Sequence, residues 1–153
     1  MKLGGDLQTV LVNPQGQAFD IGKTQYPDIN PAHLLKYRVE ELKADFLVLH
    51  ICPVASGGGM LTVFTILPDN TPFRAADIEH HWETLDNPRE TLFTDSDGDG
   101  IPELRDWNAY RWHGTNTYYS FDGRQFHPLW RDYYEAPADD DYNMKFVLRT
   151  KAH

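Results

Sequence analysis

The sequence predicts an α+β protein: a mainly antiparallel β-sheet with one or two helices, in a single domain covering residues 1–153. Three observations lead to this fold class. Aromatic residues make up 13% of the chain, and they favour pleated, half-buried surfaces. Residues 46–54 and 60–67 are β-rich apolar runs, whereas residues 31–43 and 74–85 carry apolar side chains at helical spacing. Helices that cover one face of an antiparallel sheet form a common α+β arrangement, and 153 residues is the length of one domain.

The N-terminal segment carries the signal of a β-hairpin. Residues 7–12 and 17–21 are apolar runs that flank a short turn sequence containing Pro14 and Gly16. Proline sets φ for the turn and glycine supplies a positive φ. We therefore expect two antiparallel strands here.

Residues 31–43 fit two structures. As a helix, Asn30 caps the N-terminus, Pro31 occupies the first turn, and the apolar side chains share one face (Leu35, Val39 and Leu42). As a strand, apolar and charged side chains alternate instead (Leu35, Tyr37 and Val39 against Lys36, Arg38 and Glu40). The capping residues favour the helix, and the strand remains the alternative.

The middle of the chain predicts two central strands and then a helix. The near-continuous apolar character of residues 46–54 and 60–67 is typical of strands that are covered on both faces. Residues 74–85 follow, with apolar side chains at helical spacing (Ala75, Ile78, Trp82 and Leu85), and Pro88 ends this predicted helix.

The C-terminal part predicts short aromatic strands. Residues 91–94 favour a strand, and further strands are expected at 107–112, 117–121, 124–129 and 144–150. Asp122 and Gly123 are typical of a two-residue hairpin turn, which would place Tyr119 opposite Phe126.

The charge of the chain limits its partners. The net charge is −9, and no cluster of lysine and arginine is present, which argues against nucleic-acid binding. No apolar stretch reaches the roughly 20 residues that a membrane-spanning helix needs. The expected partners are a metal ion and a protein or glycan.

Residues 95–106 are the most informative segment of the sequence. Calcium takes six to eight oxygen ligands, and carboxylates at alternate positions of a curled loop can supply them. Counted from Asp95, Gly100 falls on position 6, where a sharp turn requires glycine. The predicted ligands are Asp95, Asp97, Asp99, the carbonyl oxygen of Ile101, Glu103 and Asp106. Magnesium is the weaker candidate, because it retains its water ligands and seldom uses an all-protein cage.

The run from Asp95 to Leu104 resembles the calcium loops of FG-GAP/VCBS repeats, and also those of thrombospondin type 3 repeats and dockerins. The resemblance implies a structural calcium ion held by Asp95, Asp97, Asp99, the Ile101 carbonyl and Glu103. In contrast to a classical EF-hand, the preceding residues favour a strand, Pro102 occupies position 8, and position 12 is an aspartate, Asp106. We therefore expect a calcium clamp between two strands.

Half of the aromatic residues lie between residues 107 and 134. They predict either the core of a sheet or a surface for stacking a ligand. The candidates for such a surface are Trp107, Trp112, Tyr118 and Trp130.

The sequence thus favours a non-catalytic, calcium-binding interaction domain that works outside the cytoplasm, where calcium is abundant. The alternatives are an inhibitor or immunity-type protein that binds a basic partner, a carbohydrate-binding module, and a hydrolase stabilised by calcium. No catalytic motif is recognisable in the sequence.

Overall fold

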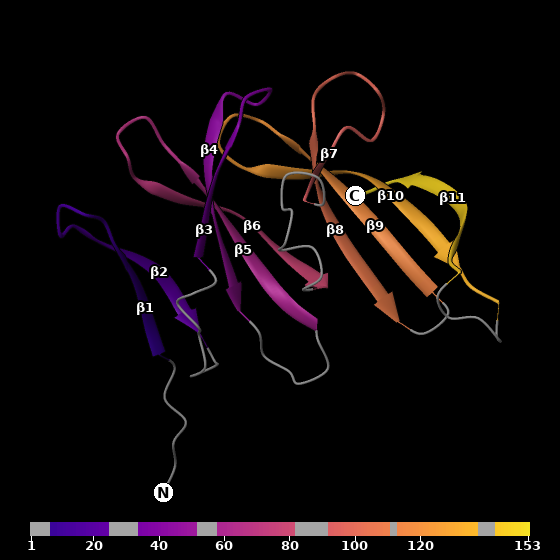
Figure 1. The fold of residues 1–153 in the computed structure, drawn as a ribbon, viewed down its shortest axis with the longest axis horizontal. Helices are drawn as coiled ribbons and strands as arrows, with labels where there is room; N and C mark the ends of the chain where they lie inside the picture. The colour runs from indigo at the N-terminus through magenta and orange to yellow at the C-terminus, as the bar shows by residue number, and fades with distance from the viewer. Residues whose placement is uncertain (1–6, 25–33, 52–57, 82–91, 111–112, 138–142) are drawn as a thin grey trace, which may run out of the picture.

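The structure is a computed structural model, and it describes residues 7–24, 34–51, 58–81, 92–110, 113–137 and 143–153. In this part of the chain the regular structure is entirely β-strand, arranged in three antiparallel sheets (Figure 1). The α+β prediction is therefore wrong for the described residues, which form an all-β fold without a helix.

The first sheet is the predicted N-terminal hairpin. Strand β1 (Leu7–Val12) pairs with β2 (Ala18–Thr24), and the pairing ends with Val12 opposite Ala18. Asn13 organises the turn, because its Oδ1 accepts hydrogen bonds from the backbone N–H of Gln15 at 3.1 Å and of Gln17 at 2.9 Å. Gly16 has a φ of 80°, the left-handed conformation that the turn sequence predicted.

The second sheet has the order β3-β4-β5-β6. Its strands are β3 (Leu34–Val39), β4 (Ala44–Ile51), β5 (Gly58–Ile66) and β6 (Pro72–His81). The two central strands, β4 and β5, confirm the strand predictions for residues 46–51 and 60–66, and residues 52–54 of the first predicted strand lie outside the described residues. Alternate side chains on them are fully buried, among them Phe46, Val48, Leu61 and Val63.

The helix predicted over residues 31–43 is wrong for the residues that the structure describes. Residues 34–39 form β3, which pairs with β4 from Leu34 opposite Leu49 to Val39 opposite Ala44. Residues 40–43 form the turn between these strands, and Lys43 adopts a φ of 52°. The alternation of apolar and charged residues decides the structure here, because pairing with β4 satisfies the backbone that a helix would otherwise satisfy internally.

The helix predicted over residues 74–85 is also wrong where it is described, because residues 72–81 form β6. The reason is a β-bulge: Phe64 of β5 pairs with Arg74 and Val63 pairs with Ala76, which leaves Ala75 as the extra residue. Ala75 and Ile78 are both buried, since the bulge shifts the alternation of the strand by one residue. The resulting spacing of three residues imitates the period of a helix.

The third sheet has the order β11-β10-β9-β8-β7. Its strands are β7 (Phe93–Thr94), β8 (Glu103–Tyr110), β9 (His113–Phe121), β10 (Phe126–Glu135) and β11 (Lys145–Lys151). The sequence predicted a strand in each of these regions.

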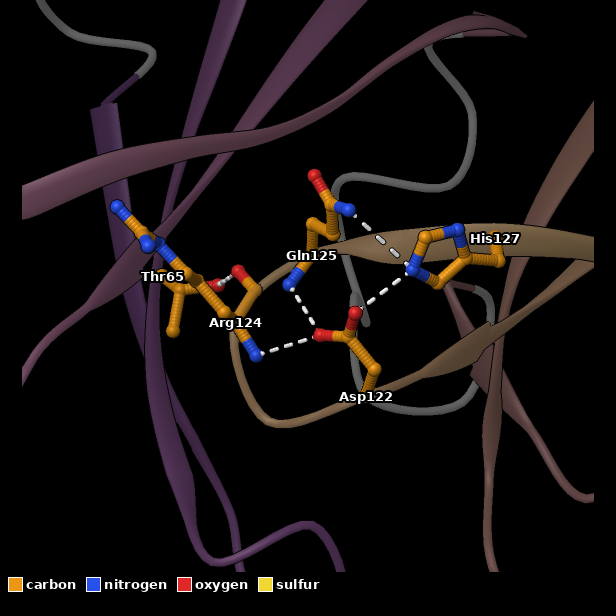
Figure 2. Close-up of polar contacts among 5 residues, drawn as sticks. All are labelled: Thr65, Asp122, Arg124, Gln125 and His127. Atoms are coloured by element: carbon orange, nitrogen blue, oxygen red, sulfur yellow. Dashed lines mark hydrogen bonds and ion pairs between the residues drawn. The ribbon is translucent and has the colours of Figure 1, made fainter.

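The hairpin between β9 and β10 has a longer turn than expected. Phe126 pairs with Phe121, so the prediction that Tyr119 lies opposite Phe126 is wrong. Asp122 closes a four-residue turn: its Oδ1 accepts hydrogen bonds from the backbone N–H of Arg124 and of Gln125, each at 2.9 Å (Figure 2). The second carboxylate oxygen lies 2.7 Å from Nε2 of His127.

The same turn joins the two larger sheets. The Thr65 hydroxyl on β5 donates a hydrogen bond to the Arg124 carbonyl oxygen at 2.8 Å (Figure 2). The Arg124 guanidinium lies 4.1 Å from the centre of the Phe73 ring on β6. These contacts fix the end of the third sheet against the second sheet.

The core lies between these two sheets. Phe46 of β4 contacts three aromatic rings of the third sheet, with centroid distances of 5.3 Å to Phe93, 5.2 Å to Phe121 and 5.5 Å to Phe126. Leu92 and Leu104 belong to the same buried cluster and flank the acidic segment. The acidic segment is therefore anchored at both ends in the core.

No described segment forms a helix with the length and apolarity that crossing a bilayer requires.

Candidate metal centre

Asp95, Asp97 and Asp99 lie in the loop that joins β7 to β8, whereas Glu103 and Asp106 lie on β8 (Figure 1). Thr94 pairs with Glu103 and closes the loop at its base. Gly98 and Gly100 have φ values of 81° and 86°, in the left-handed region. An added Cβ would meet no atom within 4 Å at either position, so the backbone conformation is what requires glycine.

Three aspartates converge inside this loop. One carboxylate oxygen from each of Asp95, Asp97 and Asp99 lies within 4.8 Å of the others, and all three residues are exposed. This is the group of metal-ligating side chains that the described residues bring together, and it can hold a cation. The coarser part of the sequence prediction, an acidic loop whose carboxylates lie close enough together to hold a metal ion, is confirmed.

Backbone N–H groups hold the three carboxylates in place. Asp95 accepts from Gly98 N–H at 2.7 Å through Oδ1 and from Gly100 N–H at 3.0 Å through Oδ2. Asp99 Oδ1 accepts from Ile101 N–H at 2.7 Å, and Asp97 Oδ1 accepts from Asp99 N–H at 3.2 Å. A carboxylate oxygen has two lone-pair sites, so each of these oxygens can still coordinate a metal ion.

The electrostatics of the cluster favour a divalent cation. Two like charges about 4 Å apart repel by about 1 kcal/mol in water, and the loop holds three such charges close together. A bound divalent ion would replace this repulsion with attraction. Oxygen is the only ligand type in the cluster, which suits a hard cation such as calcium or magnesium.

Glu103, another predicted ligand, is oriented toward Ser96. Its side chain is 4% exposed, and its Oε2 accepts hydrogen bonds from the Ser96 N–H at 2.8 Å and from the Ser96 hydroxyl at 2.5 Å. The carboxylate thus fixes the second residue of the loop to the start of β8. The role of Glu103 as a direct ligand stays a prediction, as does that of the Ile101 carbonyl.

A long-range contact that the sequence did not predict holds Ser96 from the other side. The Arg149 guanidinium on β11 donates to the Ser96 carbonyl oxygen at 2.9 Å. The same guanidinium forms a bidentate pair with Asp132 on β10, with distances of 2.6 Å and 2.9 Å. Asp132 is buried, so this pair is shielded from solvent on one side.

These three residues gave no local signal in the sequence. Arg149 is 53 positions from Ser96 and 17 positions from Asp132. Only the pairing of β10 with β11, which sets Asp132 opposite Arg149, brings them together.

Asp106, predicted as the twelfth-position ligand, lies further along β8. It lines an open hollow of about 460 Å³ together with residues of β6, β9 and β10, among them Asp77, Thr117 and Arg131. It is not part of the cluster formed by Asp95, Asp97 and Asp99. Direct ligation by Asp106 stays a prediction.

The candidate stacking residues lie on the third sheet. Tyr118 is 6% exposed, and burial raises the pKa of its hydroxyl to about 12. Trp107 is half-buried and packs edge-on against Tyr134 at 5.6 Å. Trp130 is half-buried as well, and Trp112 lies outside the described residues. Tyr118 therefore offers little surface to a ligand, whereas Trp107 and Trp130 are partly accessible.

The chain matches no protein-family model, no curated protein and no solved structure. The geometry of the acidic loop is therefore the main indication of what the protein does.

Proposed function

We propose that this protein is a calcium-binding, non-catalytic interaction domain that works outside the cytoplasm, with calcium in a structural role. The observation that carries the proposal is the convergence of the Asp95, Asp97 and Asp99 carboxylates within 4.8 Å in one loop.

The number and type of ligands that the loop supplies support the choice of calcium. Calcium accepts a flexible set of six to eight oxygens, whereas magnesium demands near-ideal octahedral geometry and loses its water reluctantly. Three side-chain ligands on an exposed, curled loop leave room for backbone carbonyls and water to complete the larger shell. The resemblance of residues 95–104 to FG-GAP/VCBS-type loops supports the same ion.

The structural role is supported by the position of the loop. It joins β7 to β8, and its residue Ser96 forms hydrogen bonds with Glu103 of β8 and with Arg149 of β11. A cation that draws the three aspartates together would tighten the loop, and with it the contact between β8 and β11. We therefore assign to calcium the stabilisation of the third sheet.

The location outside the cytoplasm is supported by the expected affinity. Single exposed calcium sites in extracellular modules have dissociation constants of roughly 0.1–1 mM. All three aspartates are exposed, which limits the strength of each interaction with the ion. Such a site is filled only where calcium is abundant.

Calorimetry and thermal unfolding test the proposal together. We expect one calcium ion to bind with a Kd of roughly 0.1–1 mM. Calcium at about ten times the Kd should stabilise the fold by about 1.4 kcal/mol relative to chelator, and magnesium at the same concentration should do much less. Equal melting temperatures in calcium and in chelator, with no heat of calcium binding, would contradict the proposal.

A matched pair of variants locates the site. Asp97→Asn removes one of the three charges while its side-chain carbonyl can still accept from Asp99 N–H. It should weaken calcium binding by about tenfold or more, because each charge contributes about 2 kcal/mol of attraction to a divalent ion at about 4 Å in water. Glu135→Gln neutralises an exposed carboxylate at the end of β10 and should leave calcium affinity unchanged.

A further inference from the structure

Strand β11 is exposed along its whole length. All seven of its residues are solvent-accessible, and three consecutive residues are among the most exposed large apolar residues of the described chain: Phe146 at 57%, Val147 at 48% and Leu148 at 45%. An exposed run of this kind on a sheet edge is a ready template for pairing with another strand.

The position of β11 leaves one of its backbone edges without a strand. It is the terminal strand of the five-stranded sheet, and within the described ranges it pairs with β10 alone. The opposite edge of the same sheet is β7, which has only two residues. Of the two edges of this sheet, only β11 is long enough to pair with an added strand over several residues.

The charge of β11 is opposite to that of the whole chain. The strand carries three cations, Lys145, Arg149 and Lys151, and no acidic residue, whereas the chain has a net charge of −9. Lys145 and Lys151 form no ion pair within the part of the chain that the structure describes. They are thus free to contact a partner.

This charge pattern opposes pairing between two copies of β11. Antiparallel pairing centred on Leu148 would set Lys145 opposite Lys151, and pairing centred on Val147 would set Lys145 opposite Arg149. Pairing centred on Arg149 would place that residue opposite itself. Like charges directly opposite each other destabilise a strand pair, whereas opposite charges stabilise it.

We propose that the outer edge of β11 binds an extended segment of another protein by strand addition, and that this segment carries acidic side chains at each end of an apolar centre. The backbone of the partner would continue the sheet beyond β11. Its acidic side chains would face Lys145 and Lys151, and its apolar centre would cover Phe146, Val147 and Leu148.

Arg149 prepares the edge for such a partner. Its guanidinium is held by Asp132 and by the Ser96 carbonyl oxygen, so the C-terminal half of β11 is fixed against β10 and the acidic loop before a partner binds. A rigid edge reduces the conformational entropy that binding costs. Strand addition rests on the proposed function in one respect, since it names the kind of partner that the interaction domain binds. It does not itself require calcium.

Synthetic peptides can test this edge directly. The first probe is a seven-residue peptide, the length of β11, with glutamates at both ends and valines in the centre. The second has lysines in place of the glutamates. We expect the acidic peptide to bind the full chain in calorimetry, to shift the backbone amide signals of residues 145–151 in NMR, and to bind at least about tenfold more tightly than the basic one.

A charge-reversal variant and its control complete the experiment. Lys145→Glu combined with Lys151→Glu should weaken the acidic peptide by about tenfold or more and improve the basic one. Lys36→Glu on the exposed face of β3 makes the same kind of change on the other sheet and should leave both affinities unchanged. Circular dichroism checks that each variant is folded. The amide shifts of the unmodified protein test peptide binding at residues 145–151 without any variant.

Three results would overturn the proposal. They are equal affinity for the two peptides, amide shifts confined to residues outside 145–151, and concentration-dependent dimerisation that the Lys145→Glu, Lys151→Glu variant alters, which would identify a second copy as the occupant. Each titration is run in calcium and in chelator. Peptide binding that is equal in calcium and in chelator supports strand addition, whereas the calcium proposal fails only if calcium gives no heat of binding and no rise in melting temperature, so the two can fail separately.

Discussion

Glu103 and Ser96 are joined by two hydrogen bonds that end on a single carboxylate oxygen. Oε2 of Glu103 accepts from both the backbone N–H and the hydroxyl of Ser96, at 2.8 Å and 2.5 Å. Because Glu103 is buried, these bonds replace the water that its charge would otherwise bind. The pair fixes the start of the acidic loop to β8.

Glu103→Gln should therefore destabilise the protein even in chelator. Hydrogen bonds to a charged group contribute roughly 1.5–3 kcal/mol, and we expect a loss of about 2 kcal/mol in the free energy of unfolding, measured by urea denaturation. Ser96→Ala removes only the hydroxyl and should cost about 1 kcal/mol.

The double variant separates the two roles of Glu103. If its main partner is Ser96, the effects of Glu103→Gln and Ser96→Ala in chelator should be strongly non-additive. If Glu103 also ligates the metal, Glu103→Gln should weaken calcium binding well beyond the effect of Ser96→Ala. Additive losses would show that the hydrogen-bonded pair does not contribute as a unit.

Asp122 should give the protein a measurable acid sensitivity. Hydrogen bonding from the Gln125 backbone, then from His127, then from the Arg124 backbone lowers the pKa of Asp122 from 3.8 to about 2. A carboxyl whose pKa is lower in the folded state stabilises the protein above its unfolded-state pKa, and this contribution is lost as the pH falls through the folded-state value. The relevant window is from about pH 4 to about pH 2.

The matched variant for this window is Asp122→Asn. The difference in melting temperature between the original protein and the variant should be steady just above pH 4 and should shrink on acidification towards pH 2, because other carboxyls titrate equally in both proteins. A difference that is the same at both ends of the window would rule out a stabilising charge at Asp122.

Gly114 is required by close packing against Trp107. A Cβ at Gly114 would clash with Cη2 of the Trp107 indole and would lie 3.0 Å from the Met144 sulfur. Gly114→Ala should therefore destabilise the fold by roughly 1–3 kcal/mol, as overpacking does elsewhere, measured by chemical denaturation.

A smaller residue at position 107 provides the control. In a Trp107→Leu background the added methyl group has room, so Gly114→Ala should cost much less than in the original protein. An equal cost in both backgrounds would indicate that the backbone of β9, and not the indole, excludes a side chain here.

The strands that the sequence located correctly are those with a local signal. Residues 46–54 and 60–67 are dense apolar runs, and within the described residues they form most of the central strands β4 and β5. The turn with Gly16 was also recognisable, since its residues impose backbone conformations over only a few positions.

The helix predicted over residues 74–85 failed for a reason that no local pattern reveals, whereas the strand at residues 34–39 follows the alternation that the sequence already offered. Ala75 and Ile78 share a buried face because a bulge opposite Val63 and Phe64 shifts the strand by one residue. A bulge depends on the partner strand, so its spacing of three resembles a helix until that partner is known. The register of Phe121 with Phe126 depends in the same way on how Asp122 closes its turn.

The sequence by itself determined the acidic loop, because Asp95, Asp97 and Asp99 are at most four residues apart and Gly98 and Gly100 allow the chain to curl around one point. Only the tertiary structure decided what holds that loop. Ser96 meets Arg149 across 53 positions, and Asp132 orients that arginine, because β10 and β11 pair beside the loop. Short-range geometry can be inferred from residue order, whereas contacts between distant strands arise only when the whole sheet has formed.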